Sequence, residues 1–394
     1  MAVNTMTFNQ LATVLNSIVT QATGKNALTA TDYSSFVSVA KTGLEAGYDP
    51  LTTAISQVLS RTIFSVRPYA RKFRGLEADR IQYGNHVRKI NYVDKAFEED
   101  DALKLTDGYS IDQYVVNKPQ VIQTNFYGTN AYQKSVTIYQ DQLDVAFSGP
   151  DEFQQFLAGV MQNLQDMLEQ AREDTSRATL ANLIAGHYYL DSQSVTDDCV
   201  IHLITEYNAH TGDSVTAATL FNPEIFPNFA KWVQGRIQTL SKMFAERTIT
   251  HHLNLSAGDI SRHTPVADQR LFLLGGYGDQ MASNVLSSVF NTEYLRTIPY
   301  EEVMFWQSIK SPDAIKLDKA GYTAADGSAA SAAVDITKVW GVLIDREAAG
   351  VTIKKQTMSN TPWNARGLYS SIFAHEWTSY WNDFTEKAVV LMLD

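Results

Sequence analysis

The feature that most constrains this chain is one long amphipathic segment near its middle. Apolar residues recur at helical spacing from Phe153 onward, which predicts a single helix over 150–186. Ser148 is a suitable N-cap, Pro150 suits the first turn, and Gly186 is the expected end. At 1.5 Å per residue such a helix is about 50 Å long. Few compact domains need a helix of that length, so the sequence predicts an elongated molecule.

Shorter helices are expected on both sides of this segment. The first sixty residues contain three amphipathic stretches, at 8–19, 28–47 and 51–59. None is long enough to bury a core of its own, so they predict an arm that packs against another part of the molecule. A second long helix is expected from Asn222, with an apolar stripe from Ile225 to Phe244, and a shorter one over 279–290.

Alternating apolar and polar residues predict strands elsewhere, first at 87–93 and 133–140. Asp107-Gly108 is a turn signal, so 66–125 is expected to form a long two-stranded hairpin that rests on another element. The stretch 319–334 is rich in Ala, Gly and Ser and is expected to be a loop. The remaining predicted strands are Gln269–Leu274, Val339–Ile344, Val351–Gln356, Leu368–Trp377 and Ala388–Leu393.

The hairpin segment carries its charges unevenly. From Arg67 to Lys89 it has seven basic and two acidic residues, and from Asp94 to Asp112 it has seven acidic and two basic residues. This division predicts docking by charge on a neighbouring subunit, while neutralisation of the two halves inside one hairpin explains it equally well. The expected contact residues are Arg67, Arg71, Lys72, Arg74, Arg80, Arg88, Lys89, Glu98, Glu99, Asp100 and Asp101.

The usual catalytic motifs are absent from the sequence. There is no Walker A loop, and Gly275–Gly278 lacks the spacing of a dinucleotide-binding loop, so a turn is expected there. His375-Glu376 begins like a zinc-protease motif, but Ser379 stands where the second histidine would be, which favours an ordinary strand or turn. We therefore expect no catalytic residues and no cofactor.

Metal sites are also not expected. The adjacent His251 and His252 point apart on any regular structure, which favours loop histidines over a ligand pair. The run 98–101 lacks the ligand spacing of a calcium loop and is interpreted as a solvated charge run. Cys199 is the only cysteine, so an intramolecular disulfide and a cysteine-based zinc site are excluded.

Net charge and hydropathy exclude further classes of protein. The formal net charge is -11, whereas a dedicated binder of nucleic acid or anionic membranes needs a basic face. No apolar stretch of about 18 residues occurs, so no membrane span is expected. The N-terminus does not have the pattern of a signal peptide.

The order of these expected elements carries a resemblance. A helical arm, a long charged hairpin, a strand, a very long helix, an α/β region and a β-rich tail follow one another in the Hong Kong 97-type fold of tailed-phage major capsid proteins. Several local stretches are also similar to strands and turns of that family. They are Thr264–Leu273, Val342–Ala348, Asn364–Tyr369, Tyr380–Asp383 and Lys387–Leu393.

The resemblance implies an α+β fold divided into named parts. The parts are an N-terminal arm over 1–65, an extended loop over 66–125, a peripheral domain with its spine helix over 126–194, an axial and peripheral α/β region over 195–335 that includes the loop 319–334, and a β-rich region over 336–394 that closes the fold.

The resemblance also implies a function in assembly rather than catalysis. Subunits would form the pentamers and hexamers of an icosahedral phage shell that encloses double-stranded DNA. The implied partners are further copies of the chain, a separate scaffolding protein, a portal protein, decoration proteins and the packaged DNA, with no membrane. The protein would be made in the host cytoplasm and would reside in the virion. The alternatives are an encapsulin-like nanocompartment shell protein and a soluble enzyme with an unrecognised site.

Overall fold

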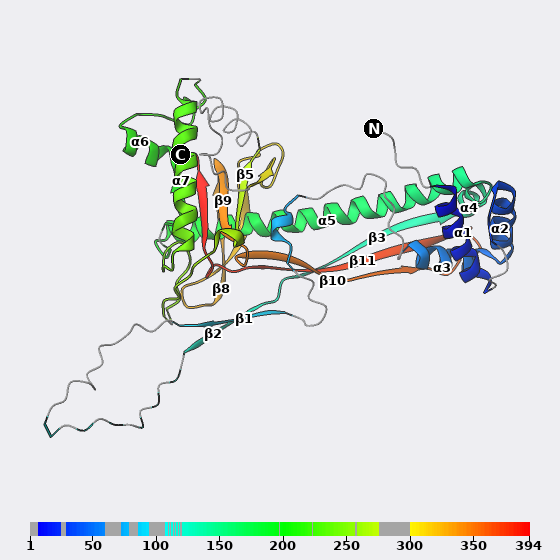
Figure 1. Ribbon diagram of the computed structural model, residues 1–394, viewed down its shortest axis with the longest axis horizontal. Helices are drawn as coiled ribbons and strands as arrows, with labels where there is room; N and C mark the ends of the chain where they lie inside the picture. Colours follow the sequence, from blue (N-terminus) through cyan, green and yellow to red (C-terminus); the bar gives the residue numbers. More distant parts are fainter. Residues whose placement is uncertain are drawn as a thin grey trace.

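The structure is a computed structural model of the chain (Figure 1). It describes residues 7–24, 29–59, 72–78, 86–93, 107, 108, the even-numbered residues from 110 to 118, 120–275 except 197, 223 and 257, and 300–394. The helix expected over 279–290 lies outside the described residues.

A long helix, α5 (Pro150–Ser192), runs along the molecule and confirms the central prediction (Figure 1). It has 43 residues and is therefore longer than expected. Ser148 is not its N-cap, because the Ser148 hydroxyl donates to the Val145 carbonyl at 2.6 Å and Gly149 occupies the cap position. Gly186 does not end the helix either. It lies inside α5, where a Cβ atom would come within 2.4 Å of the Phe384 ring.

A three-stranded antiparallel sheet lies along α5 in the order β10-β11-β3 (Figure 1). Its strands are β3 (Thr129–Tyr139), β10 (Ala349–Asn360) and β11 (Tyr369–Asn382). Alternate residues of β11, including Ile372 and Ala374, are buried, and Leu164 and Leu168 of α5 pack against Ala374. The strands predicted at 133–140, 351–356 and 368–377 are confirmed, and each is longer than expected.

The N-terminal helices gather at the beginning of α5 (Figure 1). They are α1 (Phe8–Thr23), α2 (Tyr33–Glu45) and α3 (Tyr48–Leu59), and α4 (Gln140–Ala146) joins them. Their apolar faces form one buried cluster with Phe153 and Leu157 of α5 and with Ile372 of β11. The three expected amphipathic helices are confirmed, and they bury their apolar faces against their own chain.

A five-stranded sheet stands at the other end of α5, in the order β4-β12-β9-β5-β6. Leu271 and Leu273 of β5 join a cluster with two helices, whereas Phe272 and Leu274 join the cluster that contains the second half of α5. This alternation buries both faces of the sheet. The strands are β4 (Val200–His202), β5 (Gln269–Leu274), β6 (Tyr300–Val303), β9 (Val339–Asp345) and β12 (Ala388–Met392).

The two helices that cover this sheet are α6 (Leu203–Thr211) and α7 (Phe226–Ala245). The apolar stripe predicted for the second long helix is buried on α7, including Phe229, Val233 and Phe244. The helix begins at Phe226 rather than at Asn222. The strands predicted at 269–274, 339–344 and 388–393 are confirmed as β5, β9 and β12.

The prediction of a loop over 319–334 is wrong. Strand β7 (Ile315–Thr323) and strand β8 (Ala329–Ile336) form an antiparallel hairpin instead. Backbone hydrogen bonds build this hairpin, so small side chains do not prevent it. Its turn is stabilised by the Asp326 carboxylate, which accepts from Ser328, and by Gly327 in the left-handed region at φ 84.

The expected charged hairpin is present as strands β1 (Val87–Tyr92) and β2 (Val121–Phe126). Residues 107 and 108 form a turn between them. Residues 72–78 do not run as a strand, because they contain the 3-10 helix η1 (Arg74–Leu76) and bury Phe73 and Leu76 in the core beside α5.

Candidate functional site

The first strand of the hairpin is tied to the body of its own chain by Lys89. Its ammonium lies 2.9 Å from Asp383 Oδ2 and 3.1 Å from Glu347 Oε2, and it also pairs with Glu386. The guanidinium of Arg262 lies 3.1 Å from Glu386 Oε1. Asp383 and Glu386 are buried in the turn between β11 and β12. These ion pairs therefore fix the base of the hairpin to the end of the long sheet.

The electrostatics of this cluster follow from burial and close charges. Burial opposes charge on Lys89, but the carboxylates of Asp383 and Glu386 outweigh it and raise the pKa of Lys89. Burial alone would raise the pKa of Asp383, yet the Lys89 ammonium and the Thr385 hydroxyl hold that pKa below its usual value. For Glu386 burial prevails over the effects of Lys89 and Arg262 and raises the pKa to about 7. Lys89 is thus charged at neutral pH.

The two faces of the hairpin are in different environments. Residues directly opposite each other in β1 and β2 share a face. On the inner face, Asn91 is buried and Ile122 packs against the core. On the outer face, Ile90, Tyr92 and Val121 are 53%, 65% and 48% exposed. An exposed apolar strip beside a covered face is typical of a surface that contacts a partner.

A broad hollow with a volume of about 1230 Å³ opens beside the base of the hairpin. We call it the arginine hollow, because four arginines from four separate segments line it together with four carboxylates. The charged lining residues are Arg88, Lys89, Arg247, Arg262, Arg346, Asp268, Asp345, Glu347 and Glu386.

The segment 72–78 is held in place mainly through its backbone. The Glu301 carboxylate accepts from the N–H groups of Phe73, Arg74 and Gly75, the last two at 3.2 Å. The Glu173 carboxylate accepts from the Lys72 N–H at 3.2 Å. A carboxylate that accepts several backbone N–H groups is a strong anchor. Glu173 and Glu301 therefore hold the segment 72–78 against the body of the chain.

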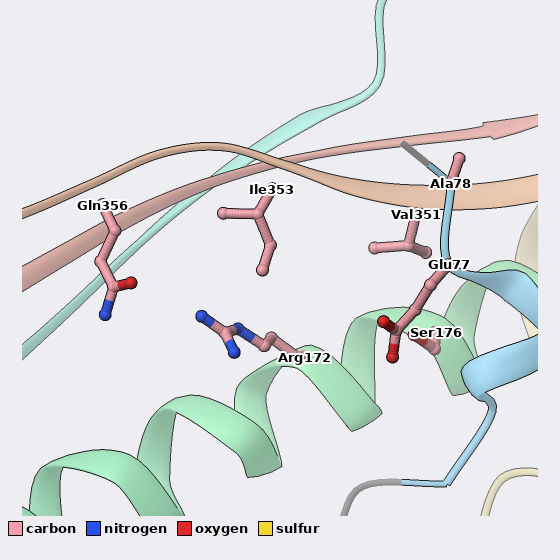
Figure 2. Close-up of a pocket in the computed structure, with 7 residues that line it drawn as sticks. All are labelled: Glu77, Ala78, Arg172, Ser176, Val351, Ile353 and Gln356. Atoms are coloured by element: carbon pink, nitrogen blue, oxygen red, sulfur yellow. The ribbon is translucent and has the colours of Figure 1, made fainter. Parts of the chain in front are cut away.

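A smaller pocket of about 200 Å³ lies between α5 and β10. Figure 2 shows Arg172 projecting from α5 into it, with Val351 and Ile353 above the helix and Glu77 beside Ser176. The Arg172 Nε donates to Glu376 Oε1 at 2.7 Å, and its guanidinium also pairs with Glu169. Arg172, which lines this pocket, thus joins the long helix to the long sheet through its ion pair with Glu376.

The predicted contact residues fall into two groups in the structure. Arg88 and Lys89 meet at the arginine hollow, whereas Lys72 and Arg74 lie on the anchored segment beside α5. Seven of the predicted residues lie outside the described residues, and they are Arg67, Arg71, Arg80, Glu98, Glu99, Asp100 and Asp101.

Sequence reasoning missed the partners of Lys89 and most of the arginine hollow. Arg247, Arg262 and Arg346 come from distant segments, so no local pattern brings them together. Asp383 and Glu386 give a weak signal, since they lie shortly before the apolar run Ala388–Leu393.

The residues considered for catalysis or metal binding have structural surroundings. His375 and Glu376 lie in β11, as expected for a strand. His251 and His252 lie in a loop, where their ring nitrogens contact backbone carbonyls. Within the described ranges, no group of three or more His, Cys, Asp or Glu side chains could hold a metal ion. None of the helices described there is long and apolar enough to span a membrane.

Comparison with known sequences finds one family. The family model described as Phi29-like phage major capsid protein matches residues 14–392. No curated protein matches the sequence.

Comparison with solved structures finds phage capsids. The capsid structure of Staphylococcus phage Andhra has a TM-score of 0.52 and 9% sequence identity, and the match covers 84% of this chain and 87% of that chain. The capsid structure of the Cyanophage P-SCSP1u has a TM-score of 0.47 and 12% identity, with 84% and 90% of the two chains covered.

Proposed function

The chain belongs to the family of Phi29-like phage major capsid proteins, and from this premise we propose how its parts build the shell. The protein is a structural component of the virion rather than an enzyme, and its copies assemble into the icosahedral phage head. Its fold is a mixed α+β fold of the Hong Kong 97-like capsid type. The observation that carries this function is the family match over 14–392, which spans almost the whole chain.

We assign the parts of the fold by their position along α5. Residues 1–65 are the N-terminal arm, 66–125 the extended loop, and 126–194 the peripheral domain with α5 as its spine. Residues 195–335 form the axial and peripheral α/β region. Residues 336–394 close the fold, which is supported by their strands: β10 and β11 lie along α5, while β9 and β12 lie in the five-stranded sheet.

Assembly then proceeds through pentamers and hexamers, with double-stranded DNA enclosed by the closed shell. Several modest interfaces act together, so none needs to be strong alone. The proposed partners besides the chain itself are a separate scaffolding protein, a portal protein and decoration proteins. The net charge of -11 supports a surface that lies near packaged DNA without binding it tightly.

The charged hairpin is the proposed contact between neighbours. Lys89 is supported as the residue that fixes the hairpin base, because its ion pairs are within the chain. Arg88, on the opposite face of β1, is exposed and available to another subunit. The outer apolar strip of Ile90, Tyr92 and Val121 supports the same role.

Electron microscopy of the purified protein, alone and with a co-expressed scaffolding protein, tests the proposed assembly. We expect closed shells with fivefold and sixfold clusters. Subunits that stay monomeric in every condition, while folded by circular dichroism, would contradict it. Shells that package a cargo enzyme instead of DNA would identify the encapsulin-like alternative.

A further inference from the structure

We propose that a second hollow at the base of the hairpin binds a small organic ammonium ion of the polyamine type. This hollow has a volume of about 660 Å³ and is lined by β2, by the β7–β8 hairpin and by the turn between β11 and β12. We call it the aromatic hollow. Its volume lies in the usual range of small-molecule sites. The inference concerns a single chain and goes beyond assembly of the shell.

The lining of the aromatic hollow is rich in rings and lacks basic groups. Six aromatic side chains contribute to it, and among the described residues no lysine, arginine or histidine does. The face of an aromatic ring carries negative charge density and attracts cations, more strongly where water is partly excluded. A cation is therefore favoured here, unlike in the arginine hollow. The aromatic residues are Phe126, Tyr127, Tyr322, Tyr380, Trp381 and Phe384.

Two side chains of the lining offer oxygen atoms that a ligand can use. Asn382 Oδ1 is buried and has no hydrogen-bond partner among the described residues. A buried acceptor without a donor is unfavourable, so a ligand that donates to Asn382 gains free energy. Asp326 Oδ1 accepts from the hydroxyl and the backbone N–H of Ser328, and these bonds lower the pKa of Asp326. The Asp326 carboxylate is therefore charged at neutral pH.

The second carboxylate of the lining is already balanced. Asp383 Oδ2 lies 2.9 Å from the Lys89 ammonium, and Asp383 Oδ1 accepts from the N–H and the hydroxyl of Thr385. Asp326 is thus the carboxylate that remains for a ligand. Calcium and magnesium ions need about six oxygen ligands, which one available carboxylate among aromatic rings does not supply. An ammonium ion needs only a few acceptors and the ring faces.

A linear polyamine satisfies all of these conditions together. Its ammonium groups donate hydrogen bonds and accept none, which matches Asn382 Oδ1 and the Asp326 carboxylate. Its methylene chain is apolar and can pack against the rings between the two ends. A phosphate-bearing ligand is disfavoured, because the lining has no basic group and the net charge of the chain is -11. A neutral ligand gains nothing from the charge of Asp326.

A bound polyamine would connect three parts of the fold. Strand β2, the β7–β8 hairpin and the turn 383–385 each form part of the lining. Lys89 ties β1 to the same turn through Asp383 and Glu386. The ligand finds its full set of contacts only when these walls are in place, so it should stabilise the base of the hairpin in the folded state.

Isothermal titration calorimetry of the full-length chain at physiological salt is the first test. The probe is cadaverine, and pentanediol is its neutral counterpart of the same length. We expect one saturable site per chain for cadaverine and no binding of pentanediol. Asp326→Asn, which can keep the bonds to Ser328, should weaken cadaverine binding about fivefold. Tyr127→Leu, at a side chain that is 66% exposed, should weaken it about threefold.

The matched control is Asp318→Asn, an exposed carboxylate on β7 that does not line the hollow. It should leave the affinity for cadaverine unchanged. If Asp318→Asn weakens binding as much as Asp326→Asn, cadaverine only accumulates on an acidic surface and the proposal is wrong. Equal binding of pentanediol, or unchanged affinity in both Asp326→Asn and Tyr127→Leu, also overturns it. Displacement of cadaverine by an equal concentration of magnesium ions would identify a metal site instead.

Hydrogen exchange with mass spectrometry locates the site. Saturating cadaverine should increase protection in peptides that cover 121–128, 321–330 and 380–385, compared with sodium chloride at the same ionic strength. The increase should be lost in Tyr127→Leu at the same concentration of cadaverine if that concentration is near the wild-type midpoint. Protection that increases only elsewhere in the chain would place the ligand outside the aromatic hollow and overturn the proposal. Either outcome leaves the capsid function intact, because shell assembly is measured separately.

Discussion

At the residue scale, His187 makes the fold sensitive to acid. It is fully buried in α5, and neither of its ring nitrogens has a hydrogen-bond partner among the described residues. Burial lowers the pKa of His187 to about 3. An unfolded histidine binds a proton below about pH 6.5. The stabilising contribution is therefore complete above pH 6.5 and is lost as the pH falls towards 3.

We predict that His187→Leu flattens this acid dependence. Urea unfolding of the free subunit between pH 7.5 and 4 is the measurement, and the variant should lose less free energy of unfolding than the wild type below about pH 6. His251 and His252, whose pKa values burial also lowers, remain in the variant and contribute to the residual slope. Parallel pH curves for the two proteins would show that His187 does not titrate in this way.

Lys89 is the second residue with a large expected effect. Lys89→Met leaves the buried carboxylates of Asp383 and Glu386 without their main partner, so we predict a loss of about 3–5 kcal/mol in the free energy of unfolding. Arg88→Met, on the adjacent exposed position of the same strand, should change it by less than about 0.5 kcal/mol. Denaturant titration of the two variants provides the comparison. Equal effects would mean that the ion-pair cluster adds no stability.

At the element scale, Gly186 and Gly159 form a natural pair within α5. A Cβ atom at Gly186 would come within 2.4 Å of the Phe384 ring, whereas one at Gly159 would meet nothing within 4 Å. Gly186→Ala should therefore destabilise the fold by about 1–3 kcal/mol. Gly159→Ala should stabilise it by up to about 1 kcal/mol through helix propensity. Thermal unfolding midpoints that shift in the same direction would contradict this assignment.

These glycines also show what the sequence could and could not predict. The periodic apolar stripe was sufficient to predict α5, because the buried positions of a helix recur at short, regular intervals along the sequence. The expected end at Gly186 was wrong, because this glycine is needed inside the helix, where the ring of Phe384, far along the chain, leaves no room for a side chain. The hairpin β7–β8 was missed for a similar reason: its Ala, Gly and Ser residues resemble a loop, while paired backbone hydrogen bonds decide the structure.

The same division applies to the site. The uneven charge of the hairpin was visible in the sequence and led to Arg88 and Lys89. The ion pairs of Lys89 were not visible, since Glu347, Asp383 and Glu386 lie more than 250 residues further along the chain. The order of elements was the strongest signal, and the family it indicated is confirmed.

At the scale of the whole molecule, the two ends of α5 hold separate hydrophobic cores. One core contains α1–α4 and Phe153, and the other contains the five-stranded sheet and the second half of α5. Separate cores open with separate free energies. We predict that Phe36→Ala, in the first core, lowers local stability there by about 3–5 kcal/mol without loosening the sheet.

Hydrogen exchange with mass spectrometry is the measurement for this prediction. Peptides from α1, α2 and α3 should lose protection in the variant, while peptides from β9 and β12 keep it. Val389→Ala, in the cluster on the α7 side of the sheet, is the reciprocal control. Uniform loss of protection over both ends would show that the molecule unfolds as one unit.

The uninterrupted length of α5 has a mechanical consequence. Its 43 residues extend over about 65 Å, and the only proline stands in the first turn, where it does not kink the helix. Such a helix, supported along its length by β3, β10 and β11, resists bending. A small tilt at one end becomes a large displacement at the other. We therefore expect shells of different curvature to differ mainly in the angles between the α5 helices of neighbouring subunits.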